Sequence, residues 1–170
     1  DITKKIIVNK LYFLISNLNF VLYILTFCFF FIFFFKFVQL KILLIILLLV
    51  CIASDIGGYI FGKIFKGPKL SKISPNKTVA GAIGSLLLSS LVILLLFYFI
   101  NEKLNYLTIV VAMITSIFCQ LGDLFFSFLK RKANLKNTGN FLPGHGGVLD
   151  RLDSILLGIP TGLISFIIFF

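Results

Sequence analysis

The sequence predicts an all-α integral membrane protein with about five transmembrane helices and two functional cytoplasmic loops. Of its 170 residues, 59% are hydrophobic and 22 are Phe, whereas soluble domains contain about 45–50% apolar residues. A chain of this length cannot bury such an excess in one water-soluble core. The apolar residues also fall in runs long enough to cross a bilayer. Lipid is therefore the solvent that suits this composition.

An α-helix needs roughly 20 mainly apolar residues to cross the hydrocarbon of a bilayer. Five segments meet this requirement, at residues 11–35, 41–62, 78–100, 106–129 and 152–170. No soluble domain, linker or internal repeat interrupts them, so we expect residues 1–170 to form a single membrane-embedded domain. Because the chain begins with Asp1 rather than Met, we expect a fragment or a processed product.

The basic residues lie mainly between the apolar segments. The net charge is +10, from 16 basic and 6 acidic residues. Such a balance suits either nucleic acid or the positive-inside bias of membrane proteins, and its placement favours the membrane, with no nucleic-acid partner. With the N-terminus inside, 13 of the 16 basic residues share one side. We therefore expect a multi-pass protein of the inner (cytoplasmic) membrane, with the long loops 63–77 and 130–151 facing the cytoplasm.

The first of these loops carries five lysines in residues 63–77. It can act simply as a topology signal that also touches anionic headgroups. Alternatively it forms a phosphate cradle with Ser74 and Lys77, in which Ser74 or Asn76 caps the third helix. The free N–H groups and positive dipole end of that helix would then favour an anion.

Four of the six acids lie in or beside the apolar segments: Asp55, Asp123, Asp150 and Asp153. A carboxylate in hydrocarbon is costly, so each is expected to face a partner or a wet cavity. Asp123 also belongs to a polar stripe at helical spacing, formed by Ser116, Gln120, Asp123 and Ser127. The stripe is either a structural hydrogen-bonded seam or a functional surface that leads into Lys130-Arg131-Lys132.

Asp150 and Asp153 are three residues apart, so on a helix they share one side while Arg151 points elsewhere. Stabilisation by the helix dipole alone would explain acids at this position. With Asp123, however, they offer hard oxygen ligands to Mg²⁺, which takes one or two carboxylates plus substrate phosphates. His145 is the only histidine and lies in a glycine-rich turn, where we favour a role towards a ligand over a structural one.

The segment from Ser127 to Asp153 closely resembles the signature of CDP-diacylglycerol synthases (phosphatidate cytidylyltransferases). It has the Ser, the Lys130-Arg131 pair, a Pro-x-His-Gly-Gly turn and an Asp-Arg-x-Asp close. One position departs, because the family's Lys-Asp pair is Lys136-Asn137 here. Upstream, residues 55–62 and 73–81 resemble two further family segments, with Ala80 where the family usually has Glu. Family members are generally longer at the N-terminus, which implies that this chain is the C-terminal catalytic part.

The resemblance implies transfer of a cytidylyl group from CTP to phosphatidate, with release of pyrophosphate. It also implies Mg²⁺, with a monovalent cation such as K⁺ assisting in some members. Asp123 and Asp150 match the metal-binding acids. We assign catalysis to these two acids with Lys130, Arg131 and His145. Substrate binding we assign to Ser74, Lys77, Lys136, Asp55, Gly146, Gly147, Arg151 and Asp153. The expected partners are CTP, phosphatidate and the lipid bilayer.

Other functions compete with this one. A CTP-dependent lipid kinase of the polyprenol type would release CDP instead of pyrophosphate. A transporter would need polar stripes across the whole bilayer, whereas here they gather near one face. An inactive homologue is suggested by Ala80 and Asn137. Finally, the small residues Gly81, Ser85 and Ser89 form one helix face, which packs either within the protomer or in a homodimer.

Overall fold

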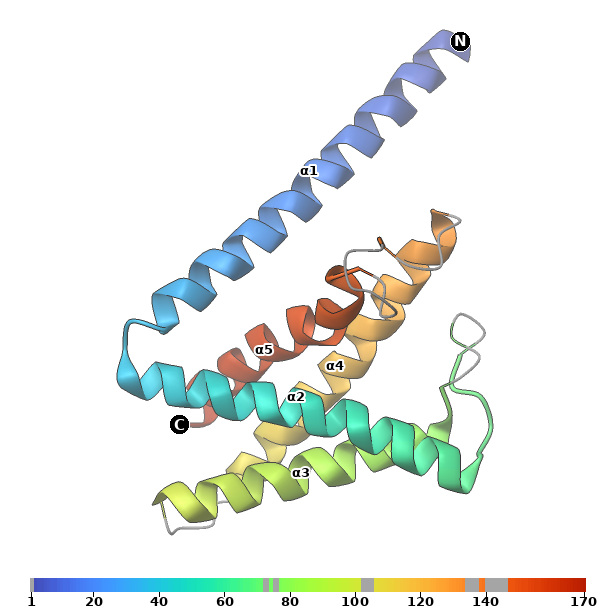
Figure 1. Cartoon of the computed structure of the whole chain (residues 1–170). Helices are drawn as coiled ribbons and strands as arrows, with labels where there is room; N and C mark the ends of the chain where they lie inside the picture. The colour runs from blue at the N-terminus through green and yellow to red at the C-terminus, as the bar shows by residue number, and fades with distance from the viewer. Residues whose placement is uncertain (1, 72–73, 75–76, 102–105, 134–137, 140–146) are drawn as a thin grey trace. The chain divides into compact units, whose positions relative to one another are not determined.

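The computed structural model describes residues 2–71, 74, 77–101, 106–133, 138–139 and 147–170. In these residues the regular structure consists of α-helices (Figure 1). They are α1 (Ile2–Phe34), α2 (Val38–Phe65), α3 (Val79–Asn101), α4 (Tyr106–Lys132) and α5 (Leu149–Phe169). The prediction of an all-α fold is confirmed.

The chain divides into two compact units, Asp1–Lys41 and Ile42–Phe170. The first unit is essentially the long helix α1, along which phenylalanine rings stack four residues apart, as in Phe27–Phe31 and Phe30–Phe34. The second unit contains most of α2 and all of α3, α4 and α5. The single domain over residues 1–170 stays a prediction.

Helices α2 to α5 are each long and apolar enough to cross a membrane. On α3, large side chains recur every four residues on the exposed surface, at Ile83, Leu87, Leu91 and Leu95, which is the stripe that a lipid-facing helix requires. The chain is therefore a multi-pass membrane protein. In the part of α1 whose side chains are described, the apolar helical stretch is Leu18–Phe34, which is shorter than a membrane span. The predicted span at 11–35 therefore stays a prediction.

The helices extend past the apolar segments that predicted them. Helix α4 continues through Lys130, Arg131 and Lys132 in its last turn, and α5 begins at Leu149, three residues before the predicted start. Hydrocarbon thickness limits the apolar segment but not the helix, and cations are favourable at a helix C-terminus. Both ends of the second long loop are thus helical, which fixes the charged residues on them.

Glycines bring α2 and α3 into close contact. A Cβ on Gly57 would lie 2.6 Å from the Gly84 carbonyl oxygen, and one on Gly81 would lie 2.6 Å from the Gly58 carbonyl oxygen. The small-residue face of α3 therefore packs within the protomer. Ser85 and Ser89 on this face are buried, and the Ser85 hydroxyl donates to the Ser54 carbonyl of α2 at 2.7 Å. A homodimer through another surface stays a prediction.

Helices α4 and α5 also lie side by side (Figure 1). Gly122 of α4 faces the α5 backbone, since a Cβ there would be 2.6 Å from the Asp153 carbonyl oxygen. Gly158 of α5 faces two cysteines, because an ideal Cβ at this position would meet Cys119 Sγ and lie 3.0 Å from Cys51 Sγ. This close packing fixes how far α5 is shifted along α4. It therefore also fixes the position of Asp150 and Asp153 at the start of α5.

Candidate active site

Charged side chains meet at one end of the second unit, where loop 66–78 and the segment after α4 approach the helix ends. Lys77, just before α3, forms an ion pair with Asp123 of α4. Lys130 of α4 binds both acids of α5, with Nζ 3.0 Å from Asp150 Oδ1 and 3.4 Å from Asp153 Oδ2. The two long basic segments therefore meet the intramembrane acids at the same end of the helices.

Loop 66–78 is folded back on itself. Lys66 has a positive φ of 42°, and Lys69 and Thr78 form an isolated antiparallel bridge. The Leu70 N–H donates to the Lys77 carbonyl at 2.8 Å, and the Val79 N–H donates to the Pro68 carbonyl at 3.0 Å. These bonds hold Lys77 at the entrance to α3, from where its side chain reaches α4.

The N-cap of α3 is Thr78, whose Oγ1 accepts a hydrogen bond from the Gly81 N–H at 3.1 Å. The prediction that Ser74 caps this helix was wrong, because Val79 is the first helical residue and only its direct neighbour can reach the free N–H groups. The Ser74 carbonyl instead accepts the Lys77 N–H at 3.2 Å. Asn76 lies outside the described residues. A phosphate-binding role for Ser74 stays a prediction.

The polar stripe on α4 combines both roles that its spacing allowed. Ser116 is fully buried and shares a 2.8 Å hydrogen bond with Ser54 of α2, which makes it part of an interhelical seam. Closer to the charged end, Gln120 Nε2 donates to the Ala82 carbonyl of α3 at 3.3 Å. Asp123 binds Lys77 and also accepts from the Ser127 hydroxyl at 3.4 Å.

Asp150 ties the second loop to α5. Its Oδ2 accepts the backbone N–H groups of Thr138 and Gly147, each at 2.9 Å, while its Oδ1 binds Lys130. The Lys130 and Asp150 side chains are only 15% and 12% exposed, so their interaction is poorly screened by solvent. Since Lys130 binds both acids, Asp150 and Asp153 do face the same neighbour, as their spacing predicts.

The acids Asp55, Asp123 and Asp153 come from three different helices and interact electrostatically, Asp123 with each of the other two. Asp55 also accepts the Ser154 hydroxyl at 2.9 Å. Like charges gathered in this way are stabilised by cations, and hard carboxylate oxygens are the ligands that Mg²⁺ prefers. One or two of these carboxylates would therefore suit Mg²⁺ only where substrate phosphates complete its shell. Within the described residues, however, His, Cys, Asp and Glu form no group of three or more that could hold a metal ion by itself.

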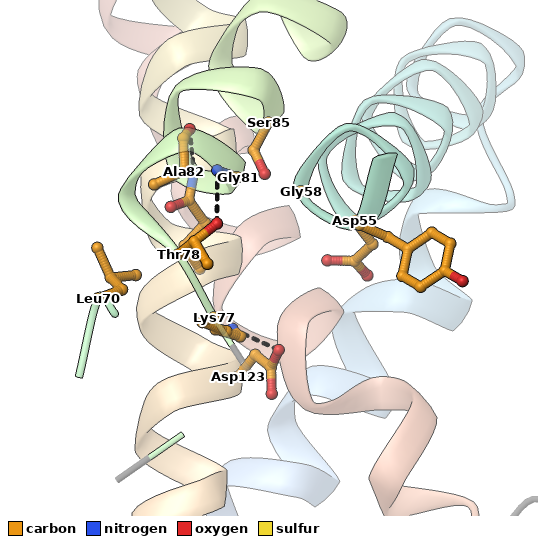
Figure 2. A pocket seen from close by; sticks show the side chains of 11 residues that line it. Asp55, Gly58, Leu70, Lys77, Thr78, Gly81, Ala82, Ser85 and Asp123 are labelled. Atoms are coloured by element: carbon orange, nitrogen blue, oxygen red, sulfur yellow. Dashed lines mark hydrogen bonds and ion pairs between the residues drawn. The ribbon is translucent and has the colours of Figure 1, made fainter. Parts of the chain in front are cut away.

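A cavity of about 250 Å³ lies between α2, α3 and α4, beside the Lys77–Asp123 pair (Figure 2). Its walls carry Asp55 and Gly58 from α2, Gly81 and Ser85 from α3, and Gln120 and Asp123 from α4. This arrangement can bind a polar, partly anionic ligand at the membrane boundary.

Several residues assigned from the sequence are not brought to this cavity by any described contact. Arg131 and Arg151 are exposed, and Gly147 donates to Asp150. Lys136, His145 and Gly146 lie outside the described residues. Sequence reasoning in turn missed Thr78 and Ser154. The Thr directly before an apolar helical run was a usable capping signal, whereas nothing in the sequence pairs Ser154 with Asp55.

Fold and site together define a multi-pass membrane protein with a charged site at one end of its helices. Comparison with known sequences identifies the family within this class. The chain belongs to the Cytidylyltransferase family, whose sequence model matches residues 2–169.

Curated relatives in this family include proteins named phosphatidate cytidylyltransferase. Those of Staphylococcus haemolyticus, Staphylococcus aureus (strain COL) and Staphylococcus saprophyticus are 47%, 46% and 44% identical over 109 residues. Each match covers 63% of this chain and 42% of the relative. The chain thus spans less than half the length of the curated relatives it matches.

Proposed function

We propose that the protein transfers a cytidylyl group from CTP to phosphatidate, giving CDP-diacylglycerol and pyrophosphate, in phospholipid biosynthesis. The observation that carries this proposal is the meeting of acids from three helices with lysines from both basic segments, beside a polar cavity. The names of the Staphylococcus relatives supply the substrate pair. The site lies on the cytoplasmic side in this proposal, because the basic segments that supply Lys77 and Lys130 follow the positive-inside rule.

The reaction joins two polyanions. A phosphate oxygen of phosphatidate attacks the α-phosphorus of CTP, a new P–O bond forms, and the bond to the departing pyrophosphate breaks. Phosphatidate is already ionised, so no strong general base is required. Catalysis then depends on positioning and on neutralising charge.

Lys77 and Lys130 are suited to this neutralisation. Each lysine forms an ion pair with one or two carboxylates of the protein. When substrate binds, each can exchange a carboxylate for a substrate phosphate without leaving the site. Arg131 and Lys136 would assist at the departing pyrophosphate, and His145, Gly146 and Gly147 would contact the substrates. The lipid tails would stay in the bilayer.

Mg²⁺ is the cofactor we propose, held by Asp123 and Asp150 beside the triphosphate, with a monovalent cation such as K⁺ in an assisting role. When bound, it would screen the triphosphate and make the α-phosphorus more electrophilic. Asp123 belongs to α4 and Asp150 to the first turn of α5, and in this proposal Lys130 would release Asp150 Oδ1 as its ammonium group turns to phosphate. Asp153, which also interacts with Asp123, would balance the charge of Lys130.

The test is a product assay with protein in lipid nanodiscs, α-labelled CTP, phosphatidate and Mg²⁺. We expect labelled CDP-diacylglycerol and unlabelled pyrophosphate, whereas a lipid kinase would release labelled CDP. Asp123→Asn should abolish turnover while leaving the thermal unfolding midpoint near that of the unmodified protein. Undiminished turnover in that variant would remove Asp123 from the site, and absence of any cytidylyl lipid from the unmodified protein would refute the function.

A further inference from the structure

The cavity has two chemically different ends. Lys77, Thr78 and Asp123 lie at its outer end, where α3 begins. Ser85 is seven residues further along α3, about 10 Å at 1.5 Å per residue. On the antiparallel α4, Gln120 is one turn deeper than Asp123. The inner end of the cavity is thus formed by Ser85 and Gln120, with Asp55 of α2 beside them, because the carbonyl of the neighbouring Ser54 accepts the Ser85 hydroxyl.

Gln120 presents an acceptor to this inner end. Its Nε2 donates to the Ala82 carbonyl at 3.3 Å and lies 3.5 Å from Ser116 Oγ. A flipped amide would place Oε1 against the Ala82 carbonyl oxygen, so this orientation is chemically fixed. Oε1 accepts no hydrogen bond from the described residues. Among these residues every buried side-chain oxygen has a hydrogen-bond partner, so Oε1 is not buried. Oε1 is therefore open to the cavity that Gln120 lines.

Ser85 presents a second acceptor. Its hydroxyl hydrogen is donated to the Ser54 carbonyl at 2.7 Å, which leaves only oxygen lone pairs for a ligand. The oxygen is directed from α3 towards α2, 2.8 Å from where a Cβ on Gly58 would stand (Figure 2). The inner end therefore offers these two neutral acceptors in addition to the Asp55 carboxylate. The side-chain donors of the cavity are on Lys77 and Thr78 at the outer end and on Tyr59, which is 69% exposed.

From this arrangement we infer that the inner end recognises the exocyclic amino group of cytosine, and that Gln120 and Ser85 select CTP over UTP. The inference rests on the proposed function. Cytosine carries an N–H₂ donor at the ring position where uracil carries a carbonyl oxygen. With uracil, the acceptor oxygens of Gln120 and Ser85 would face this carbonyl oxygen. They would then lack a hydrogen-bond donor and would repel the base. With the base at the inner end, the triphosphate extends towards Lys77 and Asp123.

A bound cation is the competing occupant of an acceptor-lined space. The Asp55 carboxylate would attract a cation, but a cavity of about 250 Å³ is far larger than one ion. The experiment nevertheless includes the cation as an outcome.

The test compares kcat/KM for CTP and for UTP in the unmodified protein, Ser85→Ala and Gln120→Met. Both changes remove an acceptor at nearly constant shape. Because the two nucleotides are compared on the same preparation, their ratio does not depend on how much protein is folded. Ser90→Ala is the matched control, since its hydroxyl bonds within α3 to the Leu86 carbonyl at 2.7 Å and does not line the cavity.

We expect the unmodified protein and Ser90→Ala to prefer CTP strongly. Each acceptor variant should lower the CTP-to-UTP ratio about tenfold to a hundredfold, which is the usual effect of losing one hydrogen bond to a buried polar group. The loss should fall on CTP and leave UTP nearly unchanged. An unaltered ratio in both variants would overturn the inference. A raised requirement for K⁺ or Mg²⁺ at constant ratio would do so as well, and would assign the inner end to a cation.

Failure of the proposed function is recognised separately. If the unmodified protein uses neither nucleotide with phosphatidate, the proposed function is refuted and equilibrium binding of CTP and UTP decides the inference. A preference for CTP that both acceptor variants lose would support it. Equal binding of the two nucleotides, or binding of neither, would overturn it.

Discussion

Gly122 of α4 should control the position of the acids on α5, although it carries no chemistry. An ideal Cβ at this position lies 2.6 Å from the Asp153 carbonyl oxygen, 3.3 Å from Leu157 Cβ and 3.4 Å from the Ser154 carbonyl oxygen. Ordinary contact begins at 3.4 Å, so Gly122→Ala requires α5 to retreat by about 0.8 Å. The closest of these atoms, the Asp153 carbonyl oxygen, belongs to the backbone and cannot rotate aside.

Two effects of Gly122→Ala can be separated. Overpacking a tight interface costs about 1–3 kcal/mol of stability. Displacing Asp153, which already binds Lys130 at 3.4 Å, weakens the charge cluster beside Asp123. A displacement of about 1 Å at a reacting centre can lower the rate roughly a hundredfold. We therefore expect turnover per folded molecule to fall by about one to two orders of magnitude.

The control is Gly162→Ala on α5, nine residues after Asp153 and further from the site. Its added Cβ would meet side-chain tips, Thr115 Oγ1 at 2.7 Å and a Leu47 methyl at 2.9 Å. It should lower the thermal unfolding midpoint to a similar extent but leave turnover per folded molecule nearly unchanged. Both variants are measured in nanodiscs by thermal unfolding and by the labelled-CTP assay. Normal turnover in Gly122→Ala, or equal losses in the two variants, would refute the positioning argument.

Three further predictions follow from the same contacts. Thr78→Ala should lower the free energy of unfolding by about 1 kcal/mol through loss of the α3 cap, and Thr78→Ser should restore most of it, as measured by chemical unfolding. Lys130→Met leaves Asp150 and Asp153 without their shared cation, which should cost about 3–5 kcal/mol and lower turnover at least tenfold; a variant as stable and active as the unmodified protein would contradict this. Chelation with EDTA should stop turnover and excess Mg²⁺ should restore it, whereas full activity in the chelator would exclude the proposed metal.

The membrane fold could be predicted from the sequence because its causes are local. Hydrocarbon thickness sets the length of an apolar segment, and the bilayer forbids unpaired backbone groups, so each such segment must be a helix. The acids could be recognised for the same reason, since a carboxylate at Asp55 or Asp123 is tolerated only with a partner. Helix ends were less predictable, because charged residues such as Lys130 and Asp150 extend a helix beyond its apolar part.

The sequence alone determined that α2 to α5 cross the membrane as helices and that acids and lysines gather near one end of them. The tertiary structure decided which groups meet. Only helix packing pairs Lys77 with Asp123, places Lys130 between Asp150 and Asp153, and brings Ser154 to Asp55. These partners are 20 to 99 residues apart in the sequence, and no local preference encodes such pairings. They follow instead from glycines that let α2 approach α3 and α4 approach α5, a steric fact that appears only when the helices are in contact.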